Sequence, residues 1–314
     1  MTSHLNPSLH KRIYIQEVVT RDGFQAESVF IPTEEKIALI DRLSHAGYAK
    51  IEVSSFTSPK AIPMLADAEV VMHSINRVPG VEYAALIPNL KGAERAIAVG
   101  VDEFNLVMSV SEAHNQANLK MSREDSFKGL SSVIDLAHSN KIAINISLST
   151  SFGCPMSGIT PLNELMHWID QFSDKGIRGI TICDTTGMAN PGQVQELCET
   201  VQAKHANLQW TLHFHNTRGM GLANALTAVN SGIDRFDSSL GGLGGCPYAP
   251  GATGNICTEE LVHMFDLMGL KTQMQIDTLL ECSKDLQKII GRTLPSQLLV
   301  AGKVDRVHEV PCQI

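Results

Sequence analysis

The sequence has no long hydrophobic run and no tract of basic residues. Its apolar stretches fall short of the roughly 20 residues with which a helix crosses a membrane, and residues 1–11 lack the apolar centre of a secretory signal. The net charge of −8 is unlike that of a protein that coats nucleic acid. We therefore expect a cytoplasmic protein that binds neither a membrane nor nucleic acid.

Cysteine is sparse and irregularly placed. The seven cysteines are an odd number without a short regular spacing, so we expect no disulfide framework. No second cysteine lies at the spacing of a zinc cluster from Cys246. This cysteine usage is typical of a reducing compartment.

The first predicted strand is not followed by the glycine-rich phosphate turn of a dinucleotide-binding sheet. Thr20-Arg21-Asp22-Gly23 stands there instead, which argues against an open doubly wound sheet. Short β-branched or apolar runs alternate with stretches of helical period, and this order implies parallel strands joined by right-handed crossovers. The predicted strands are 13–19, 50–56, 81–87, 103–109, 143–149, 179–183, 209–215 and 235–239, and the predicted helices are 33–46, 90–99, 123–140, 161–175, 191–204, 219–231 and 258–268.

Eight such units close a barrel. The fold class expected is therefore α/β, a single (β/α)8 TIM barrel over about 13–268 with a short C-terminal helical extension over about 269–314. The extension is too small for an independent domain, so residues 1–314 are expected to form one catalytic domain.

Unusual polar residues stand at the carboxyl ends of the predicted strands, where barrel enzymes place their catalytic groups. Glu52 lies inside an apolar run, and a carboxylate in a barrel strand must be paired or functional. Asp184 is a candidate catalytic acid, although it could merely cap the next helix. The other residues at these ends are Arg21, Asp22, His213 and His215.

His213 and His215 flank one residue of a predicted strand, so both imidazoles point to one face. Two neutral imidazoles on one face suit a divalent metal, although the pair could also be hydrogen-bonded barrel histidines. The Asp22 carboxylate and the Asn255 carboxamide would complete a mixed nitrogen and oxygen set. Such a set favours Mg2+ or Mn2+ over a structural zinc.

Arg21 and the glycine-rich segment 240–254 each allow two interpretations. Arg21 could stabilise negative charge that develops on an oxygen, or form only a surface ion pair with Asp22. The segment could be a mobile lid that delivers Cys246 as a general acid or base. Alternatively, its glycines could only meet backbone constraints.

These motifs resemble those of the 3-hydroxy-3-methylglutaryl-CoA lyases, metal-dependent barrel lyases related to Claisen-type synthases. The resemblance covers about 13–268. Its most specific part is Asp237-Ser238-Ser239, Gly242-Leu243-Gly244-Gly245-Cys246-Pro247-Tyr248 and Gly251-Ala252-Thr253-Gly254-Asn255. Further matches are Arg21-Asp22-Gly23, Gln25, Ile51-Glu52, Ser55-Phe56, Ser58-Pro59-Lys60, Pro88-Asn89-Leu90-Lys91-Gly92 and Gly153-Cys154-Pro155.

The resemblance implies cleavage of the C2–C3 bond of an acyl-CoA thioester into acetyl-CoA and a keto acid, which is acetoacetate if the substrate is 3-hydroxy-3-methylglutaryl-CoA. It also implies a homo-oligomer, a dimer. By position, the metal ligands would be Asp22, His213, His215 and Asn255, the enolate-stabilising arginine Arg21, the proton shuttle His213, the lid thiol Cys246, and the supporting acids Glu52 and Asp184.

Four residues are predicted to contact the substrate: Gln25, Asn145, Ser147 and Arg218. Asn145-Ile146-Ser147 stands where the family carries Arg-x-Tyr, and Arg218 stands where it carries a tyrosine. We therefore expect an acyl group other than methylglutaryl, gripped by Arg218 in place of the missing arginine. The alternative is that Arg218 faces solvent and the pocket is unchanged.

Three other functions compete with a methylglutaryl lyase or its close variant. A Claisen-type synthase of the same barrel group generally carries a sizeable C-terminal extension, and the stretch after residue 268 is short. A pyruvate-releasing aldolase is disfavoured by the loop around Cys246. A non-catalytic barrel scaffold would show gaps among the metal and acid–base positions, and the sequence has none.

Overall fold

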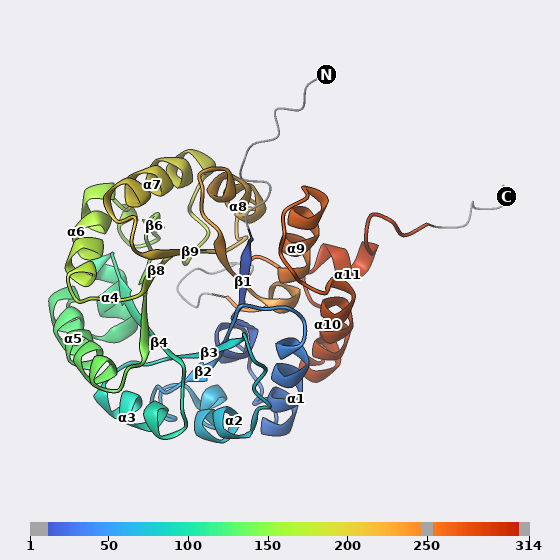
Figure 1. Ribbon diagram of the computed structural model, residues 1–314, viewed down its shortest axis with the longest axis horizontal. Helices are drawn as coiled ribbons and strands as arrows, with labels where there is room; N and C mark the ends of the chain where they lie inside the picture. Colours follow the sequence, from blue (N-terminus) through green and yellow to red (C-terminus); the bar gives the residue numbers. More distant parts are fainter. Residues whose placement is uncertain (1–11, 246–253, 308–314) are drawn as a thin grey trace.

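The apolar runs that predict strands do form a barrel. The computed structural model describes residues 12–245 and 254–307, and within them eight parallel strands close in the order β1-β10-β9-β8-β5-β4-β3-β2 (Figure 1). The predicted (β/α)8 fold is confirmed. The strands are β1 Tyr14–Glu17, β2 Lys50–Ser55, β3 Glu82–Leu86, β4 Glu103–Ser109, β5 Ala143–Ser149, β8 Gly179–Asp184, β9 Gln209–Phe214 and β10 Arg235–Ser238.

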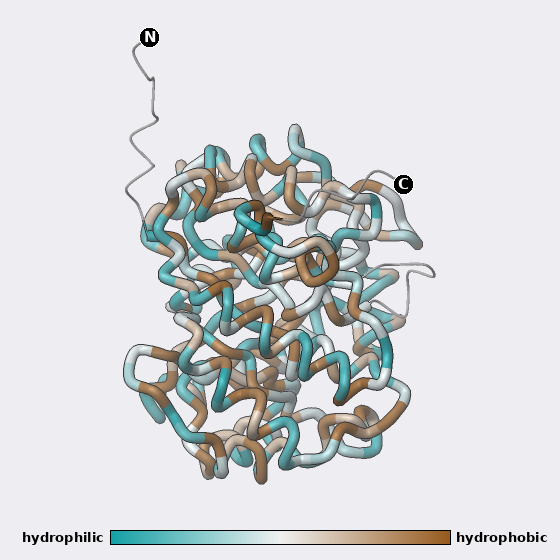
Figure 2. Tube along the Cα trace, turned by 90° about the vertical axis from the view of Figure 1, so that its right-hand side faces the viewer, coloured by the Kyte–Doolittle hydropathy of each residue, from teal (hydrophilic) through white to brown (hydrophobic). Residues whose placement is uncertain are grey.

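Helices surround the barrel, and their apolar faces pack on it (Figure 1). In Figure 2, hydrophobic and hydrophilic segments alternate along the outer chain, as expected of helices with one buried face. The helices are α1 Thr33–Ser44, α2 Ala68–Ser74, α3 Leu90–Ala98, α4 Glu112–Leu119, α5 Arg123–Ser139, α6 Leu162–Ser173, α7 Pro191–Lys204, α8 Gly221–Asn230, α9 Thr258–Leu267, α10 Ile276–Ile290 and α11 Gln297–Ala301.

Helix α7 has the bounds that the sequence predicts because its start is encoded locally. Asn190 and Gln193 form a reciprocal capping box, and Pro191 occupies the first turn. Helices α2 and α4 were not predicted, since elements of two turns give too short an apolar repeat to recognise. The small hairpin of β6 (Gly153–Cys154) and β7 (Gly158–Ile159) was missed for the same reason.

The C-terminal extension continues the outer ring. Helix α10 packs between α9 and α1 through buried Leu279, Cys282 and Leu286, and α11 packs on α9 and α10 (Figure 1). The extension therefore shares its core with the barrel.

The amino ends of the strands carry a cluster of ion pairs. Arg178 binds both oxygens of Glu82, each at 2.6 Å, and also contacts Glu103, which Lys50 contacts in turn. These residues start or precede strands β2, β3, β4 and β8, so the cluster closes the barrel at the end opposite the candidate site.

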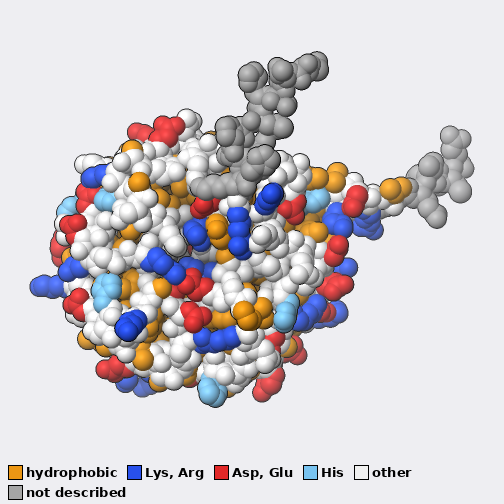
Figure 3. All heavy atoms as spheres, viewed as in Figure 1, with side chains coloured by type: hydrophobic (Ala, Val, Ile, Leu, Met, Phe, Trp, Pro, Cys, Tyr) orange, Lys and Arg blue, Asp and Glu red, His pale blue; other side chains and the backbone are white. Residues whose placement is uncertain are grey.

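The structure also shows surface charges of both signs and buried thiols. On the face that Figure 3 shows, acidic and basic side chains are interspersed. Five cysteines in the described ranges are free thiols: Cys154, Cys183, Cys198, Cys257 and Cys282. Among the described residues, no helix has both the length and the apolar character needed to cross a membrane.

Candidate active site

A turn after β1 presents Arg21 and Asp22 at the carboxyl end of the barrel. Residues Val19–Gly23 form one turn of π-helix directly beyond the strand. Gly23 is the last residue of this turn, and a side chain there would press on Val19 and Leu243 at 3.1 and 3.2 Å. The turn thereby places two adjacent charged side chains over the barrel interior.

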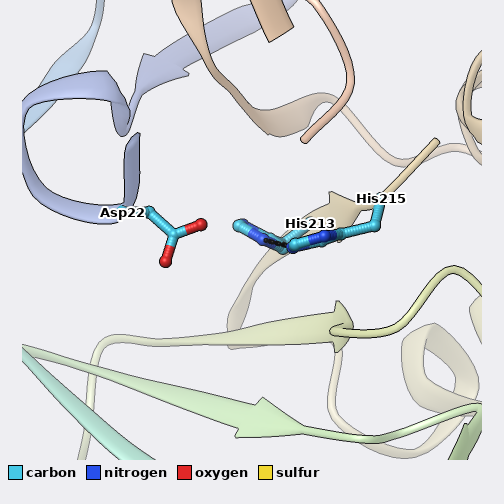
Figure 4. Close-up of side chains that lie close together, drawn as sticks. All are labelled: Asp22, His213 and His215. Carbon is cyan, nitrogen blue, oxygen red and sulfur yellow. Dashed lines mark hydrogen bonds between the residues drawn. The ribbon is translucent and has the colours of Figure 1, made fainter. Parts of the chain in front are cut away.

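The end of β9 supplies two imidazoles. His213 and His215 point to the same face, and their Nε2 atoms are 3.2 Å apart. Phe214 points the other way, toward the ring of Phe152. One ligand atom from each of Asp22, His213 and His215 can be chosen so that all lie within 4.8 Å of one another (Figure 4).

Asn255 reaches the same place by pairing with β9. Its backbone forms a bridge with His215, and its Nδ2 donates to Asp22 Oδ2 at 2.8 Å and to the Leu243 carbonyl at 3.1 Å. Its Oδ1 is buried without a hydrogen-bond partner among the described residues. A buried oxygen acceptor beside an anionic carboxylate is what a bound cation would satisfy.

Two glycines, Gly244 and Gly254, allow two segments of the chain to lie in close contact beside Asn255. A side chain at Gly254 would meet the carbonyl oxygens of Gly244 and Gly242 at 2.0 and 2.3 Å. Gly244 has a φ of +108° and lies against the Asn255 side chain. Backbone constraint therefore accounts for these glycines, whatever the loop between them does.

The electrostatics of the cluster suit a divalent cation. Burial alone would raise the pKa of Asp22, but Arg21 and the two histidines lower it to about 2, so this carboxylate is ionised. Burial and the neighbouring His213 lower the pKa of His215 to about 3, which keeps it neutral with a free lone pair. An anionic oxygen, neutral imidazoles and an unsatisfied amide oxygen fit a hard or borderline divalent ion.

His213 differs from His215 because it has a carboxylate partner. Its Nδ1 lies 3.2 Å from Asp237 Oδ2. Burial lowers the pKa of His213, but Asp237 and Asp22 more than offset this, and the pKa is raised above its usual value. The pair therefore combines a neutral imidazole with one that accepts a proton readily.

Arg21 and Glu52 form the centre of a polar network inside the barrel. Arg21 Nε donates to Glu52 Oε2 at 2.5 Å, and Nη1 donates to Asp22 Oδ1 at 2.6 Å. Asn105 donates to the other Glu52 oxygen at 2.7 Å and accepts from Asn145 and Ser147. The guanidinium is thus held from two sides, and Glu52 is paired, as a carboxylate in a barrel strand must be.

Comparison with known proteins shows the family of this chain. The HMGL-like family model matches residues 12–286. The Bacillus subtilis protein named hydroxymethylglutaryl-CoA lyase YngG is 43% identical over 293 residues, which are 93% of this chain and 98% of that protein. The human mitochondrial hydroxymethylglutaryl-CoA lyase is 37% identical over 94% of this chain and 90% of its own length.

A solved structure, described as an HMG-CoA lyase from Acinetobacter baumannii in complex with coenzyme A and 3-methylmalate, is 44% identical to this chain. It has a TM-score of 0.92 and covers 99% of this chain and 100% of its own. The chain belongs to the HMGL-like family. The resemblance that the motifs predict is thereby confirmed, together with the enzyme class, a lyase.

In this HMGL-like barrel the remaining predicted acid, Asp184, ends β8. Its Oδ1 accepts from the backbone N–H groups of Met188 and Ala189 at 2.7 and 3.0 Å, so it does cap the following turn. Its Oδ2 is buried with no hydrogen-bond partner among the described residues. Burial, opposed by these two N–H groups, raises the pKa of Asp184 to about 6. One carboxylate oxygen therefore remains for a further role.

The predicted substrate contacts occupy different levels of this HMGL-like barrel. Asn145 and Ser147 are buried on β5, and Asn145 also donates to Thr181 at 2.9 Å. Gln25 lies just beyond the Asp22 turn and is partly exposed. Arg218 is exposed, and its Nη1 donates to the carbonyls of Thr186 and Gly187 at 3.0 and 2.8 Å. Cys246 lies outside the described residues.

Two residues of the site, Asp237 and Asn105, were given no role by the sequence alone, although Asp237 stands in the family motif. Both are polar residues within predicted strands, so the argument used for Glu52 would have selected them. Asp237 is paired in register with His213, its neighbour on β9. A carboxylate behind an imidazole fixes the tautomer and orientation of the ring.

Proposed function

We propose that this chain is a divalent-metal-dependent lyase that cleaves the C2–C3 bond of a 3-hydroxy-3-methylglutaryl-CoA-like thioester. The products are acetyl-CoA and a keto acid. The observation that carries the proposal is the convergence of Asp22, His213, His215 and Asn255 beside a guanidinium held by Glu52. The names of the relatives, all hydroxymethylglutaryl-CoA lyases, support the same substrate class.

Asp22, His213, His215 and Asn255 would hold Mg2+ or Mn2+. A bound divalent ion would polarise the hydroxyl and carbonyl oxygens of the substrate. The Asn255 amide is already turned for this role, because its nitrogen is bonded to Asp22 and Leu243 while its oxygen is left over.

His213 is proposed as the proton shuttle for the C3 hydroxyl: because its Nδ1 faces Asp237 and its Nε2 faces the metal site, it would take up the proton at Nε2 in exchange for the metal. Asp237 orients its ring and raises its proton affinity. As the O–H proton leaves, C3 becomes a ketone carbon and the C2–C3 bond breaks. Its electron pair stays on C2, which becomes the enolate of the acetyl thioester.

Arg21 would stabilise that enolate. Its Nε and Nη1 are fixed by Glu52 and Asp22, so the guanidinium meets developing negative charge without having to reorganise. The buried, unpaired oxygen of Asp184 is a second site at which a proton can be held. Protonation of C2 then completes acetyl-CoA, and we assign this proton to the Cys246 thiol.

Replacement of Cys246 by serine, or its alkylation, should lower turnover by about a hundredfold, because a hydroxyl is a far weaker acid at neutral pH. The measurement is CoA-product formation under substrate saturation. Cys198→Ala, on the buried face of α7, is the matched control and should leave turnover unchanged. Normal turnover in Cys246→Ala would show that the loop only covers the site.

The CoA portion of the substrate has a cavity available beside the metal ligands. It has a volume of about 450 Å3, and its walls include Gly244, Gly254, Ala26 and the stretch from Arg292 to Pro295. Arg292 is half exposed and binds Glu27 at 2.5 Å, so a basic group borders this space. The glycines place the cavity next to Asp22 and Asn255.

A second candidate is a lyase for a different branched 3-hydroxyacyl-CoA. Asn145 and Ser147 are small polar groups in the barrel interior. Arg218, in the loop after β9, donates to carbonyls of the loop that follows Asp184. Because Nη1 of Arg218 is occupied by two carbonyls, its other N–H groups would have to grip an acid group of the substrate.

The experiment that tests both candidates compares kcat/KM for the methylglutaryl thioester and for bulkier or differently carboxylated analogues, with CoA products detected by mass. We expect an analogue to be preferred and Arg218→Tyr to shift the ratios. Arg77→Tyr is the matched control, since Arg77 also caps two carbonyls, those of Val99 and Gly100. If the methylglutaryl thioester has the highest kcat/KM and Arg218→Tyr changes no ratio of kcat/KM between substrates, the hypothesis of an altered substrate pocket is wrong. Condensation without cleavage would indicate a synthase. A protein that catalyses neither reaction would be a non-catalytic scaffold.

Three further proposals concern the whole molecule. Residues 1–314 form one catalytic domain, because α10 buries its apolar face against α1 and α9. The protein resides in the cytoplasm, where free thiols such as the five described ones persist. It forms a homodimer, which sedimentation at working concentration would test.

A further inference from the structure

Glu17, the last residue of β1, is fully buried and receives five hydrogen bonds. Its Oε1 accepts from the backbone N–H groups of Val18, Val19 and Leu240 at 3.0, 2.8 and 3.0 Å. Its Oε2 accepts from the Tyr48 hydroxyl at 2.5 Å and from the Thr258 hydroxyl at 3.1 Å. One carboxylate therefore joins segments that are far apart in the sequence.

Three of these segments lead directly to the candidate metal ligands and the glycine-rich loop. Val19 begins the turn that carries Arg21 and Asp22. Leu240 opens the turn Leu240–Gly242, called the loop stem below, which begins the glycine-rich segment 240–254. Thr258 begins α9, three residues beyond Asn255. In the part of the chain that the structure describes, the hydrogen bonds of Glu17 go to none of the proposed ligands.

We propose that Glu17 is a positioning residue, whose carboxylate holds the Asp22 turn, the loop stem and the Asn255 segment in one arrangement so that the ligands converge. The proposal rests on the metal-dependent activity proposed above. It assigns a role in ligand geometry to a side chain that lies below the site.

The nature of the five donors separates this role from simple stabilisation. All five are neutral, so no cation among them balances the buried carboxylate. Burial, opposed by the bonds from Tyr48, Leu240, Val19 and Thr258, raises the pKa of Glu17 to about 7. A buried anion without a cation costs stability. What Glu17 contributes is therefore the shared acceptor that fixes three chain segments.

The loop stem is held at a second point, which makes its position precise. The N–H of Gly241, next to Leu240, donates to Glu259 Oε2 at 2.8 Å. Gly241 has a φ of +65°, and a side chain there would meet Leu294 at 2.4 Å. Two successive amides of this turn are thus bound by two buried carboxylates, from β1 and α9.

The test compares Glu17→Gln and Glu17→Ala with the wild type in three measurements: Mn2+ affinity by electron paramagnetic resonance, kcat, and Tm. Glutamine keeps the shape but is a weaker acceptor and forces the Tyr48 and Thr258 hydroxyls to turn. We expect Glu17→Gln to weaken Mn2+ binding and lower kcat by about tenfold, and Glu17→Ala by about a hundredfold. The Tm of Glu17→Gln should be equal to or above that of the wild type, because the buried charge is gone.

Glu103→Gln is the matched control, because Glu103 is equally buried and its carboxylate is also hydrogen-bonded, to Lys50 and Arg178, but it lies in the ion-pair cluster at the opposite end of the barrel. It should lower Tm without changing Mn2+ affinity. If Glu17→Gln keeps wild-type Mn2+ affinity and kcat, or loses them only in proportion to a fall in Tm, the inference is overturned. Failure of the wild type itself to bind Mn2+ or to cleave a thioester would instead overturn the proposed function.

Discussion

Arg21→Met is expected to lower kcat by about a thousandfold, the upper end of the loss seen when one oxyanion-stabilising donor is removed. The guanidinium is held by Glu52 and Asp22 before substrate arrives, so its N–H groups act chiefly when negative charge develops. Binding of the substrate should survive, and the loss should appear in kcat rather than in KM.

Metal affinity of Arg21→Met should change by less than about tenfold, because two effects oppose each other. Loss of a positive charge beside Asp22 strengthens binding of a cation, while loss of the hydrogen bond from Arg21 leaves the Asp22 carboxylate less firmly positioned and weakens it; Asn255 still holds Asp22 Oδ2. Arg178→Met is the matched control, since Arg178 also joins two carboxylates but at the other end of the barrel. Turnover of Arg21→Met within tenfold of the wild type would exclude charge stabilisation by this residue.

Removal of divalent metal by a chelator is expected to abolish cleavage, and Mg2+ or Mn2+ should restore it. The reason is the donor set: an ionised Asp22, a neutral His215 and an amide oxygen of Asn255 that lacks a partner among the described residues. Activity should be followed by formation of the CoA product while metal is added back to the stripped protein.

His215→Ala should weaken Mn2+ binding by at least about tenfold and leave the fold intact, as far-ultraviolet circular dichroism would report. His205→Ala is the control, because His205 binds Asp170 at 2.8 Å and lies outside the cluster. Undiminished turnover in metal-free protein would falsify the metal assignment.

Much of the barrel could be predicted because strands are encoded by consecutive residues. Strands β4 and β5 have the predicted bounds, since each is a continuous run that is buried along its length. The π-helical turn Val19–Gly23 could not be predicted, because one turn is too short to show a period. The pairing of Glu52 could be predicted, since its apolar surroundings require it, but its partner Arg21 was not identified as such.

The candidate site shows the same division. That His213 and His215 share a face follows from the period of two in a strand, and any strand would give it. That Asp237 stands behind His213 depends on the register of β10 against β9. Asn255 and Asp22 are 233 residues apart in the chain, and their contact depends on the backbone bridge between Asn255 and His215.

The sequence by itself determined the eight-unit alternation, the family and most candidate ligands, since these depend on residue type and local spacing. Only the tertiary structure decided that Glu17 joins the Asp22 turn to the loop stem and to α9, and that Asn105 connects Glu52 to β5. The physical reason is that such contacts form across the closed barrel. Closure and register are set by the packing of the whole core, which no short stretch of sequence contains.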